Sequence, residues 1–229
     1  MSRLVTLMLS FALLFGVLAT PAPEPRHVEV RLTDYAVNRI TVIGDSYTTG
    51  SDQGGTGADG WPTAVWRTLS QHGIAVTPTV AAEGGAGYCT RGNRGSVFED
   101  LTVRAVKPND ALVVFFGSRN DMDVDPTRLS VAMYGTLQLA RQIARKAKFL
   151  VVGPPWPTAN PPESILRIRD VLGYQAELAG ASFVDPIAAR WFVGRPELIG
   201  TDGVHPTNAG HRYLAEKLAP LIGAQLYPY

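Results

Sequence analysis

Three side chains in this sequence have the types and spacing that acyl transfer requires. Ser46 carries a hydroxyl that can attack a carbonyl carbon, but such a hydroxyl is a poor nucleophile at neutral pH and needs an adjacent base. His205 can be that base, and Asp202 lies three residues earlier, where it can fold back and orient the imidazole. We therefore predict that Ser46, Asp202 and His205 are the catalytic residues.

The tetrahedral intermediate of acyl transfer carries a negative oxygen, which needs preorganised hydrogen-bond donors. We expect these donors to be the backbone N–H groups of Ser46 and Gly85 and the side-chain amide of Asn120. Gly84 is a second candidate, and Gly85 is preferred because it lies further along the same turn. Glycine at this position would let the backbone approach the substrate closely.

The elements that position these residues are predicted to alternate between strands and helices. Strands are expected at 40–43, 74–81, 112–116, 149–152 and 182–184, and helices at 61–71, 97–106, 127–146, 164–178 and 208–222. Apolar strands that alternate with helices indicate a parallel sheet covered on both faces. The predicted fold class is therefore α/β, a three-layer α/β/α domain around a central, mostly parallel sheet of about five strands.

In open parallel sheets, ligands bind beyond the carboxyl ends of the strands. Ser46, Gly85 and Asn120 follow the first three predicted strands, so we expect them to converge at one edge of the sheet. Residues 27–32 alternate between apolar and polar side chains, which predicts an added edge strand.

Composition restricts the class of protein further. The chain has 229 residues, of which 45% are hydrophobic and 18% charged, so it can bury a core and is not expected to be disordered. The formal charge is +1 and no basic stripe is present, which argues against nucleic acid as a partner. The single Cys, Cys89, can form neither an intrachain disulfide nor a Cys-rich zinc site. We expect one catalytic domain over 39–229 that uses no metal and no cofactor.

The N-terminal residues have the pattern of an export signal. Arg3 precedes an uncharged apolar run, and small residues end that run at Ala19, which predicts a signal peptide over 1–19. A Pro-rich segment over 20–38 then leads into the domain. We expect a protein that is secreted or held in the cell envelope, with no stable membrane insertion once the leader is cleaved. An uncleaved membrane anchor is the alternative.

Two further patterns have more than one interpretation. Residues 55–60 match Gly-x-Gly-x-x-Gly, but roughly ten residues separate them from the preceding strand, so a loop flanking the site is favoured over a dinucleotide site. Four aromatic residues near the predicted loops can either line the pocket or belong to the core. They are Tyr47, Trp61, Tyr88 and Trp156.

The order of these segments resembles the four blocks of the SGNH hydrolases, the GDSL esterase/lipase superfamily. The blocks are Gly44-Asp45-Ser46, the glycine after the second strand, Gly…Asn-Asp after the third strand, and Asp202-x-x-His205. They span nearly all of 39–223 in the family's order. The resemblance implies the nucleophile, triad and oxyanion roles given above, on a flavodoxin-like fold.

One block departs from the family pattern. The third block is usually Gly-x-Asn-Asp, whereas this chain has Gly-Ser-Arg-Asn-Asp with one extra residue, so the backbone at Ser118 or Arg119 is an alternative to the Asn120 amide. The resemblance implies a secreted serine esterase that cleaves acyl esters of small molecules or glycans. The alternatives are an acyltransferase that uses the same site and a catalytically impaired domain that binds envelope components or carbohydrate.

Overall fold

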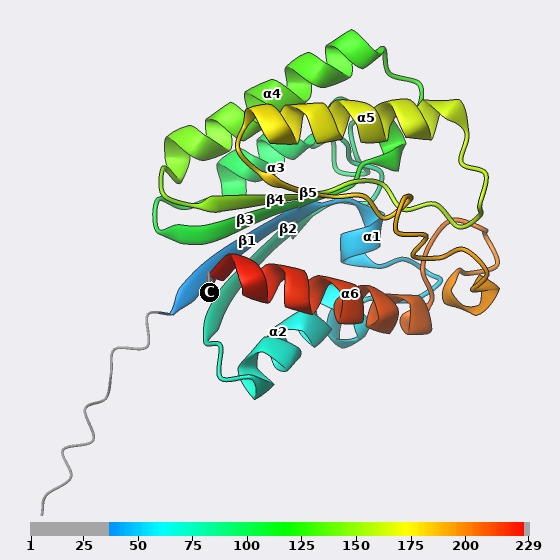
Figure 1. Cartoon of the computed structure of the whole chain (residues 1–229), viewed down its shortest axis with the longest axis horizontal. Helices are drawn as coiled ribbons and strands as arrows, with labels where there is room; N and C mark the ends of the chain where they lie inside the picture. The colour runs from blue at the N-terminus through cyan, green and yellow to red at the C-terminus, as the bar shows by residue number, and fades with distance from the viewer. Residues whose placement is uncertain (1–36, 227–229) are drawn as a thin grey trace, which may run out of the picture. The chain divides into compact units, whose positions relative to one another are not determined.

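The computed structural model describes residues 37–226 and contains a five-stranded sheet in which every neighbouring pair of strands is parallel (Figure 1). The strand order is β2-β1-β3-β4-β5. The strands are β1 (Asn38–Gly44), β2 (Val76–Ala82), β3 (Asp110–Phe116), β4 (Lys148–Val152) and β5 (Ser182–Val184). The predicted leader over 1–19, most of the Pro-rich segment and the expected edge strand at 27–32 lie outside the described residues.

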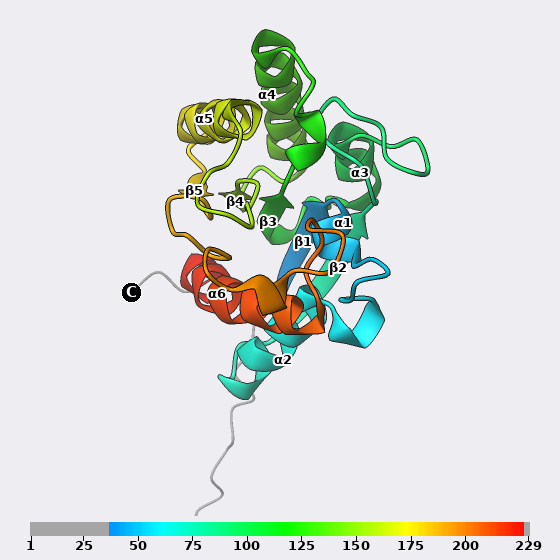
Figure 2. The ribbon, with the colours of Figure 1, turned by 90° about the vertical axis from the view of Figure 1, so that its right-hand side faces the viewer.

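Helices cover both faces of this sheet (Figures 1 and 2). One face packs against α3 (Phe98–Ala105), α4 (Pro126–Ile143) and α5 (Glu163–Leu178). The other face packs against α2 (Trp61–Gln71) and α6 (Asn208–Leu226). The predicted three-layer α/β/α fold is therefore confirmed, with five parallel strands.

Burial on both faces explains the composition of the central strands. β3 contains the run Leu112-Val113-Val114-Phe115-Phe116, and all five side chains are fully buried. Successive side chains of a strand point to opposite faces, so this continuous apolar run supplies both cores at once. Phe115 belongs to the core under α3, α4 and α5, whereas Phe116 belongs to the core under α2 and α6.

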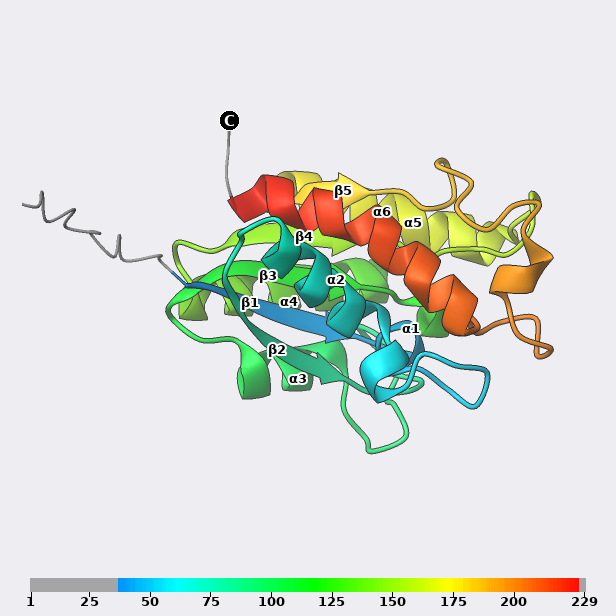
Figure 3. The same cartoon turned by 90° about the horizontal axis from the view of Figure 1, so that it is seen from below.

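The carboxyl ends of the strands lie together at one end of the sheet. β1 leads there into α1 (Ser46–Thr49), as the view from below shows (Figure 3). The register pairs Gly44 with Ala82 of β2 on one side and with Phe116 of β3 on the other. The segments that follow these three strands therefore start side by side, and they carry the predicted site residues.

Candidate active site

Ser46 is the first residue of α1, a single helical turn that begins directly after β1. The carboxylate of Asp45 caps this turn by accepting the backbone N–H of Tyr47 at 2.9 Å. Gly44 makes the sharp change of direction possible, because a Cβ at this position would lie 2.3 Å from Oγ1 of Thr48. As the first helical residue, Ser46 has a backbone N–H without an intrahelical acceptor.

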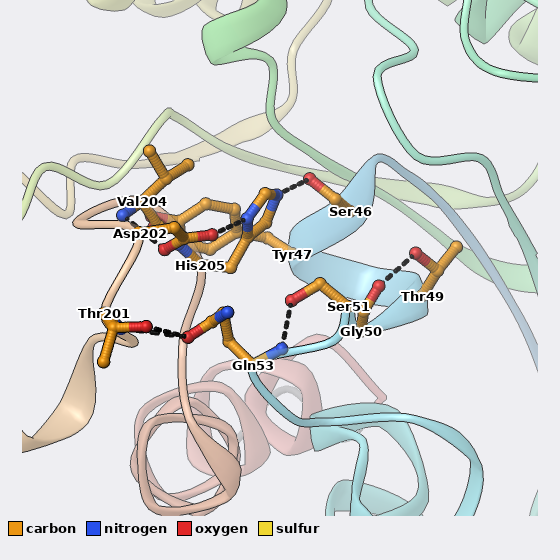
Figure 4. A network of polar contacts seen from close by, with 10 residues as sticks. All are labelled: Ser46, Tyr47, Thr49, Gly50, Ser51, Gln53, Thr201, Asp202, Val204 and His205. Atoms are coloured by element: carbon orange, nitrogen blue, oxygen red, sulfur yellow. Dashed lines mark hydrogen bonds and ion pairs between the residues drawn. The ribbon is translucent and has the colours of Figure 1, made fainter.

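The structure brings the three predicted catalytic side chains into one chain of hydrogen bonds (Figure 4). Nε2 of His205 lies 3.0 Å from Oγ of Ser46, and Nδ1 lies 2.6 Å from Oδ2 of Asp202. The other carboxylate oxygen, Oδ1 of Asp202, accepts the backbone N–H groups of Val204 and His205 at 2.8 and 2.9 Å. The imidazole is thus held by a carboxylate that is itself fixed by its own loop.

Hydrogen bonding keeps Asp202 ionised. Burial by itself would raise the pKa of Asp202, but the hydrogen bonds from the His205 ring and from the backbone N–H groups of His205 and Val204 outweigh it and lower the pKa to about 2. A carboxylate that remains charged favours the imidazole tautomer with its proton on Nδ1. Nε2 is then free to accept a proton from Ser46.

Residues that follow β1 also hold the loop that carries His205. The Tyr47 hydroxyl donates to the backbone carbonyl of Val204 at 2.5 Å, and the side-chain oxygen of Gln53 accepts the Thr201 N–H at 2.9 Å (Figure 4). Tyr47 is buried, and its ring packs edge-on against Phe116 and Phe192. Ser46 and His205 are therefore positioned by one connected set of contacts.

The predicted oxyanion residues line the same cavity as Ser46 and His205. This cavity has a volume of about 650 Å³, and Gly84, Gly85 and Asn120 contribute to its wall. Gly85 has a φ of +78°, a left-handed conformation that side chains disfavour. A Cβ at position 85 would make only ordinary contacts beyond 3.4 Å. Glycine is therefore favoured here by the backbone conformation and not by a lack of space.

Asn120 lines the same cavity as Ser46, but other groups of the protein already accept from its side-chain amide. Its Nδ2 donates to the backbone carbonyl of Ala86 at 2.8 Å and, over a longer distance of 3.4 Å, to Oδ2 of Asp45. The role of Asn120 as an oxyanion donor stays a prediction, and it requires one of these amide hydrogens to turn toward the substrate. Of the two backbone alternatives, Arg119 lines the cavity, whereas Ser118 is fully buried and is not among the lining residues.

Asp45 is fully enclosed between the nucleophile turn and the third block. Burial raises its pKa to about 7, against the opposing effects of the hydrogen bond from Tyr47 and the positive charge of Arg119. Asp121 is also buried, and its carboxylate accepts the N–H groups of Tyr88, Cys89 and Thr90 at 2.8 to 3.0 Å. The extra residue in the third block therefore leaves Asp121 as a brace for the segment after the glycine turn.

The two ambiguous sequence patterns are resolved by packing. Tyr47, Trp61 and Tyr88 are almost fully buried and belong to the core, whereas Trp156 is half-buried. The glycine-rich loop at 55–60 packs on the start of α6, where the Gly55 N–H donates to Oδ1 of Asn208 at 2.8 Å. The closeness of this packing explains Gly55, because a Cβ there would overlap the His211 ring.

Sequence reasoning missed part of the cavity wall. Glu83 is buried next to Gly84, and its carboxylate accepts the backbone N–H groups of Arg94 and Ser96. These bonds fold the segment 92–96 back over the glycine turn, where the Asn93 N–H donates to the Gly84 carbonyl at 2.9 Å. The available signal was the acidic residue directly before the two glycines, but its partners lie a full loop away.

The described residues also limit other kinds of site. Within 37–226, no group of three or more His, Cys, Asp or Glu side chains is arranged to hold a metal ion. In the same range, no helix is both long enough and apolar enough to span a membrane. Burial raises the pKa of the Cys89 thiol to about 11, which disfavours a reactive thiolate.

Known proteins resemble this chain in sequence and in structure. A protein of Mycobacterium tuberculosis described as "GDSL lipase Rv0518" is 54% identical over 229 residues, which cover 99% of each chain. Among solved structures, that of TesA is 23% identical and superposes with a TM-score of 0.67 over 82% of this chain and 100% of its own. A family two carbohydrate esterase from Clostridium thermocellum is 18% identical, with a TM-score of 0.65 over 82% of this chain and 64% of its own.

The structural likenesses show the fold, and the sequence comparisons show the family. The family model described as "GDSL-like Lipase/Acylhydrolase family" matches residues 42–213, which include Ser46 and His205. The relative with 54% identity is described as a GDSL lipase and therefore indicates the same family. The chain therefore belongs to the GDSL-like lipase/acylhydrolase family of the SGNH superfamily, and it is an ester-bond hydrolase.

Proposed function

We propose that the protein is a serine esterase that hydrolyses carboxylic esters through an acyl-enzyme on Ser46. The observation that carries this proposal is the unbroken chain of contacts from Oγ of Ser46 through the His205 ring to Asp202, with distances of 3.0 and 2.6 Å. These distances are within the range for proton transfer between a nucleophile and its base, and between a base and its orienting carboxylate.

Each half-reaction uses His205 twice. As Oγ of Ser46 attacks the ester carbonyl, Nε2 of His205 takes the hydroxyl proton and then gives it to the departing alcohol oxygen. Water then attacks the acyl-enzyme in the same way: it loses a proton to Nε2, and Ser46 regains that proton as the acid leaves. Asp202 stabilises the imidazolium in both steps without taking a proton itself.

Donors around the cavity stabilise the negative oxygen of each tetrahedral intermediate. The Ser46 N–H and the Gly85 N–H are assigned to this role, together with the Asn120 amide after it turns from its protein acceptors. Loss of one such donor typically costs about 10²–10³ in kcat. This assignment is supported by the position of Ser46, Gly85 and Asn120 in the wall of one cavity.

A polar substrate suits the cavity better than a long acyl chain does. The wall includes Thr49, Ser51, Asn93 and Arg94, whose polar side chains can contact a polar substrate. The relative with 54% identity is described as a lipase, whereas two of the structures that resemble this fold are described as carbohydrate esterases. We infer small-molecule or glycan esters with short acyl groups as the substrate class.

Export completes the proposal. The apolar run before Ala19 supports a cleaved signal peptide and a protein that acts outside the cytoplasm. The mass of the protein recovered from the culture medium of an expressing bacterium would test this step. A mature chain that begins at Thr20 is expected, and a full-length chain found only in the membrane fraction would favour the anchor.

The deciding experiment labels the nucleophile. The folded protein is exposed to a fluorophosphonate probe and examined by mass spectrometry, and hydrolysis of short 4-nitrophenyl esters is measured in parallel. A single adduct on Ser46 is expected, and both the adduct and turnover should disappear in Ser46→Ala. In His205→Ala, turnover is expected to fall by about 10⁴-fold or more, since the base and the nucleophile act as a unit.

The same experiment separates the alternatives. If the folded protein forms no adduct and releases no burst of 4-nitrophenol, the esterase proposal is wrong and a binding domain is favoured. An acyltransferase would form the adduct and pass the acyl group to an added sugar alcohol faster than to water.

A further inference from the structure

Arg119 brings a positive charge into the catalytic cavity. It is the residue before Asn120 in the third block, and it lines the same wall as Ser46, Val204 and His205. The proposed Ser-His-Asp mechanism has no task for its guanidinium. Its presence beside the nucleophile therefore calls for a separate explanation.

The guanidinium is held in place by stacking. Its central carbon lies 4.7 Å from the centroid of the Trp156 ring, and the side chain is half-buried. Stacking on an aromatic face keeps the planar fork of N–H donors in one orientation, so little further entropy is lost when a ligand binds. Trp156 is only partly buried against the core, so its ring is available for this contact.

Among the described residues Arg119 forms no ion pair, although its charge lies close enough to Asp45 to lower the pKa of that carboxyl. Within residues 37–226, no Asp or Glu oxygen lies within 4.0 Å of its guanidinium, and its buried Nη1 has no hydrogen-bond partner. Burial of a charged donor without a partner is unfavourable unless a bound group supplies the missing acceptor. A hydrogen bond with the Tyr47 side chain uses part of the guanidinium, and Nη1 is left for an acceptor that comes from outside the chain.

The other charges around the cavity differ in this respect. The Arg94 guanidinium lies 3.8 Å from the Glu83 carboxylate and also donates to the Ala82 carbonyl at 2.9 Å. Asp52 is exposed to solvent, which screens its charge. One unpaired positive charge therefore remains beside the nucleophile, and it matches a monoanion. A planar guanidinium binds a carboxylate through two parallel hydrogen bonds.

We propose that Arg119 binds a carboxylate carried by the ester substrate and makes the enzyme select anionic over neutral esters. This inference rests on the proposed esterase function, because it assigns a specificity to that same site. It makes Arg119 a substrate-binding residue that acts through KM, whereas Ser46 and His205 act in the chemical step.

The competing explanation is an internal role for Arg119. Its charge opposes the rise in pKa that burial causes in Asp45 and in Tyr47, and its side chain also forms a hydrogen bond with that of Tyr47. If that were its only role, removal of the charge would disturb Asp45 and slow all esters alike. The two roles are therefore separated by a ratio of rates for charged and neutral substrates.

The test uses two matched pairs of esters. Mono-4-nitrophenyl succinate and its methyl ester differ by a charge on the acyl side, and 4-acetoxybenzoate and its methyl ester differ by a charge on the alcohol side. Values of kcat/KM are measured for the wild type, Arg119→Met and Arg119→Lys. Arg94→Met removes the other cavity cation, and Arg67→Met on α2 controls for net charge.

The wild type is expected to prefer the charged member of at least one pair. Arg119→Met should lower that preference on the order of ten- to a hundredfold, mainly through KM, as loss of a hydrogen bond to a charged group does. Arg119→Lys should keep part of the preference, because it retains the charge and loses the fork. Arg67→Met should leave it unchanged, and Arg94→Met should change it less than Arg119→Met does.

Several results would overturn the inference. They are a wild type without preference in either pair, an Arg119→Met ratio equal to that of the wild type, and a loss that Arg94→Met or Arg67→Met reproduces in full. Circular dichroism and the Tm of each variant show that the fold is intact, and Arg119→Lys answers the question if Arg119→Met does not fold. Failure of the esterase proposal would look different, since the neutral esters would then be hydrolysed independently of Ser46 or not at all.

Discussion

Two adjacent glycines follow β2, and the structure distinguishes between them. Gly85 has a φ of +78°, whereas the φ of Gly84 lies outside the left-handed region. A Cβ at Gly84 would come within 3.1 Å of Nδ2 of Asn93, which is the end of a flexible side chain. The backbone at 85 therefore tolerates a side chain less well than the backbone at 84, although both line the cavity.

This difference predicts the effect of adding one methyl group. Gly85→Ala places an L-residue in the left-handed region, at a cost of about 1–2 kcal/mol, and displaces the N–H that is assigned to the oxyanion. We expect a lower Tm and a fall in kcat of about tenfold or more. Gly84→Ala is the matched control and should affect both less, as measured by calorimetry and ester hydrolysis. A larger loss in Gly84→Ala would move the oxyanion role to Gly84.

At the scale of elements, a hydrogen bond joins α1 to the loop before α6. The Tyr47 hydroxyl on α1 donates to the Val204 carbonyl next to His205, although these residues are 157 positions apart in the sequence. Tyr213 provides a comparison, because its ring packs against the same Phe192 but belongs to α6. Both rings pack against Phe192, but Tyr47 also donates a hydrogen bond to the loop that carries His205. We therefore assign a positioning role to Tyr47 and none to Tyr213.

Removal of the Tyr47 hydroxyl should loosen His205, the proposed base. Tyr47→Phe leaves the Val204 carbonyl without its donor, at a cost of roughly 1 kcal/mol, while the ring remains in the core. We expect kcat to fall roughly tenfold with KM nearly unchanged, because the loss affects alignment in the chemical step. Tyr213→Phe should retain kcat. Full activity in Tyr47→Phe would show that Asp202 alone positions His205.

The sequence predicts most elements well, for reasons visible in the packing. β3 is an unbroken apolar run because it is buried on both faces, and α2 begins with Trp61-Pro62 and ends just before Gly73, as helix-terminal preferences indicate. The single turn of α1 was missed, because four residues carry too little periodic signal and Asp45 is its only local mark.

The contacts of the site likewise include some that the sequence predicts and some that it does not. The Ser46–His205 contact was predictable, because a serine nucleophile needs a base and the segments beyond the carboxyl ends of parallel strands meet at one edge of the sheet. The acceptors of the Asn120 amide and the stacking of Arg119 on Trp156 were not predictable. Both depend on the path of loops that meet only after the sheet has formed.

At the scale of the whole molecule, two buried titrating groups act in opposite directions. Burial lowers the pKa of His211 from 6.5 to about 4, assisted by the charge of His205 and opposed by Asp59. The neutral ring of His211 lies against Gly55, and its Nδ1 faces the Trp61 N–H at 3.4 Å. Burial raises the pKa of Asp45 from 3.8 to about 7.

The signs of the two contributions follow from the proton balance. His211 binds fewer protons in the folded state, so its contribution is present above pH 6.5 and is lost as the pH falls toward 4. Asp45 binds more protons in the folded state, so its contribution is present below pH 3.8 and is lost as the pH rises through 7. Each is worth roughly 3–4 kcal/mol, so the two nearly cancel over the shared interval.

We therefore expect the free energy of unfolding of the wild type to change little between pH 4.5 and 6.5. His211→Gln should be less stable at pH 6.5 than at pH 4.5, and Asp45→Asn should show the reverse. Urea unfolding at both pH values measures these differences, and His72→Gln, which changes an exposed imidazole, is the control. Variants whose profiles are as flat as that of the wild type would contradict both assignments.

The distance along the chain between Ser46 and His205 has a consequence of its own. Their contact joins positions 159 residues apart, and the segment between them contains four of the five strands. No partial assembly that lacks one end of this segment can bring Ser46 against His205. A chain that is still being synthesised therefore cannot form this contact before residue 205 has left the ribosome, so we expect ester hydrolysis to appear only late in synthesis.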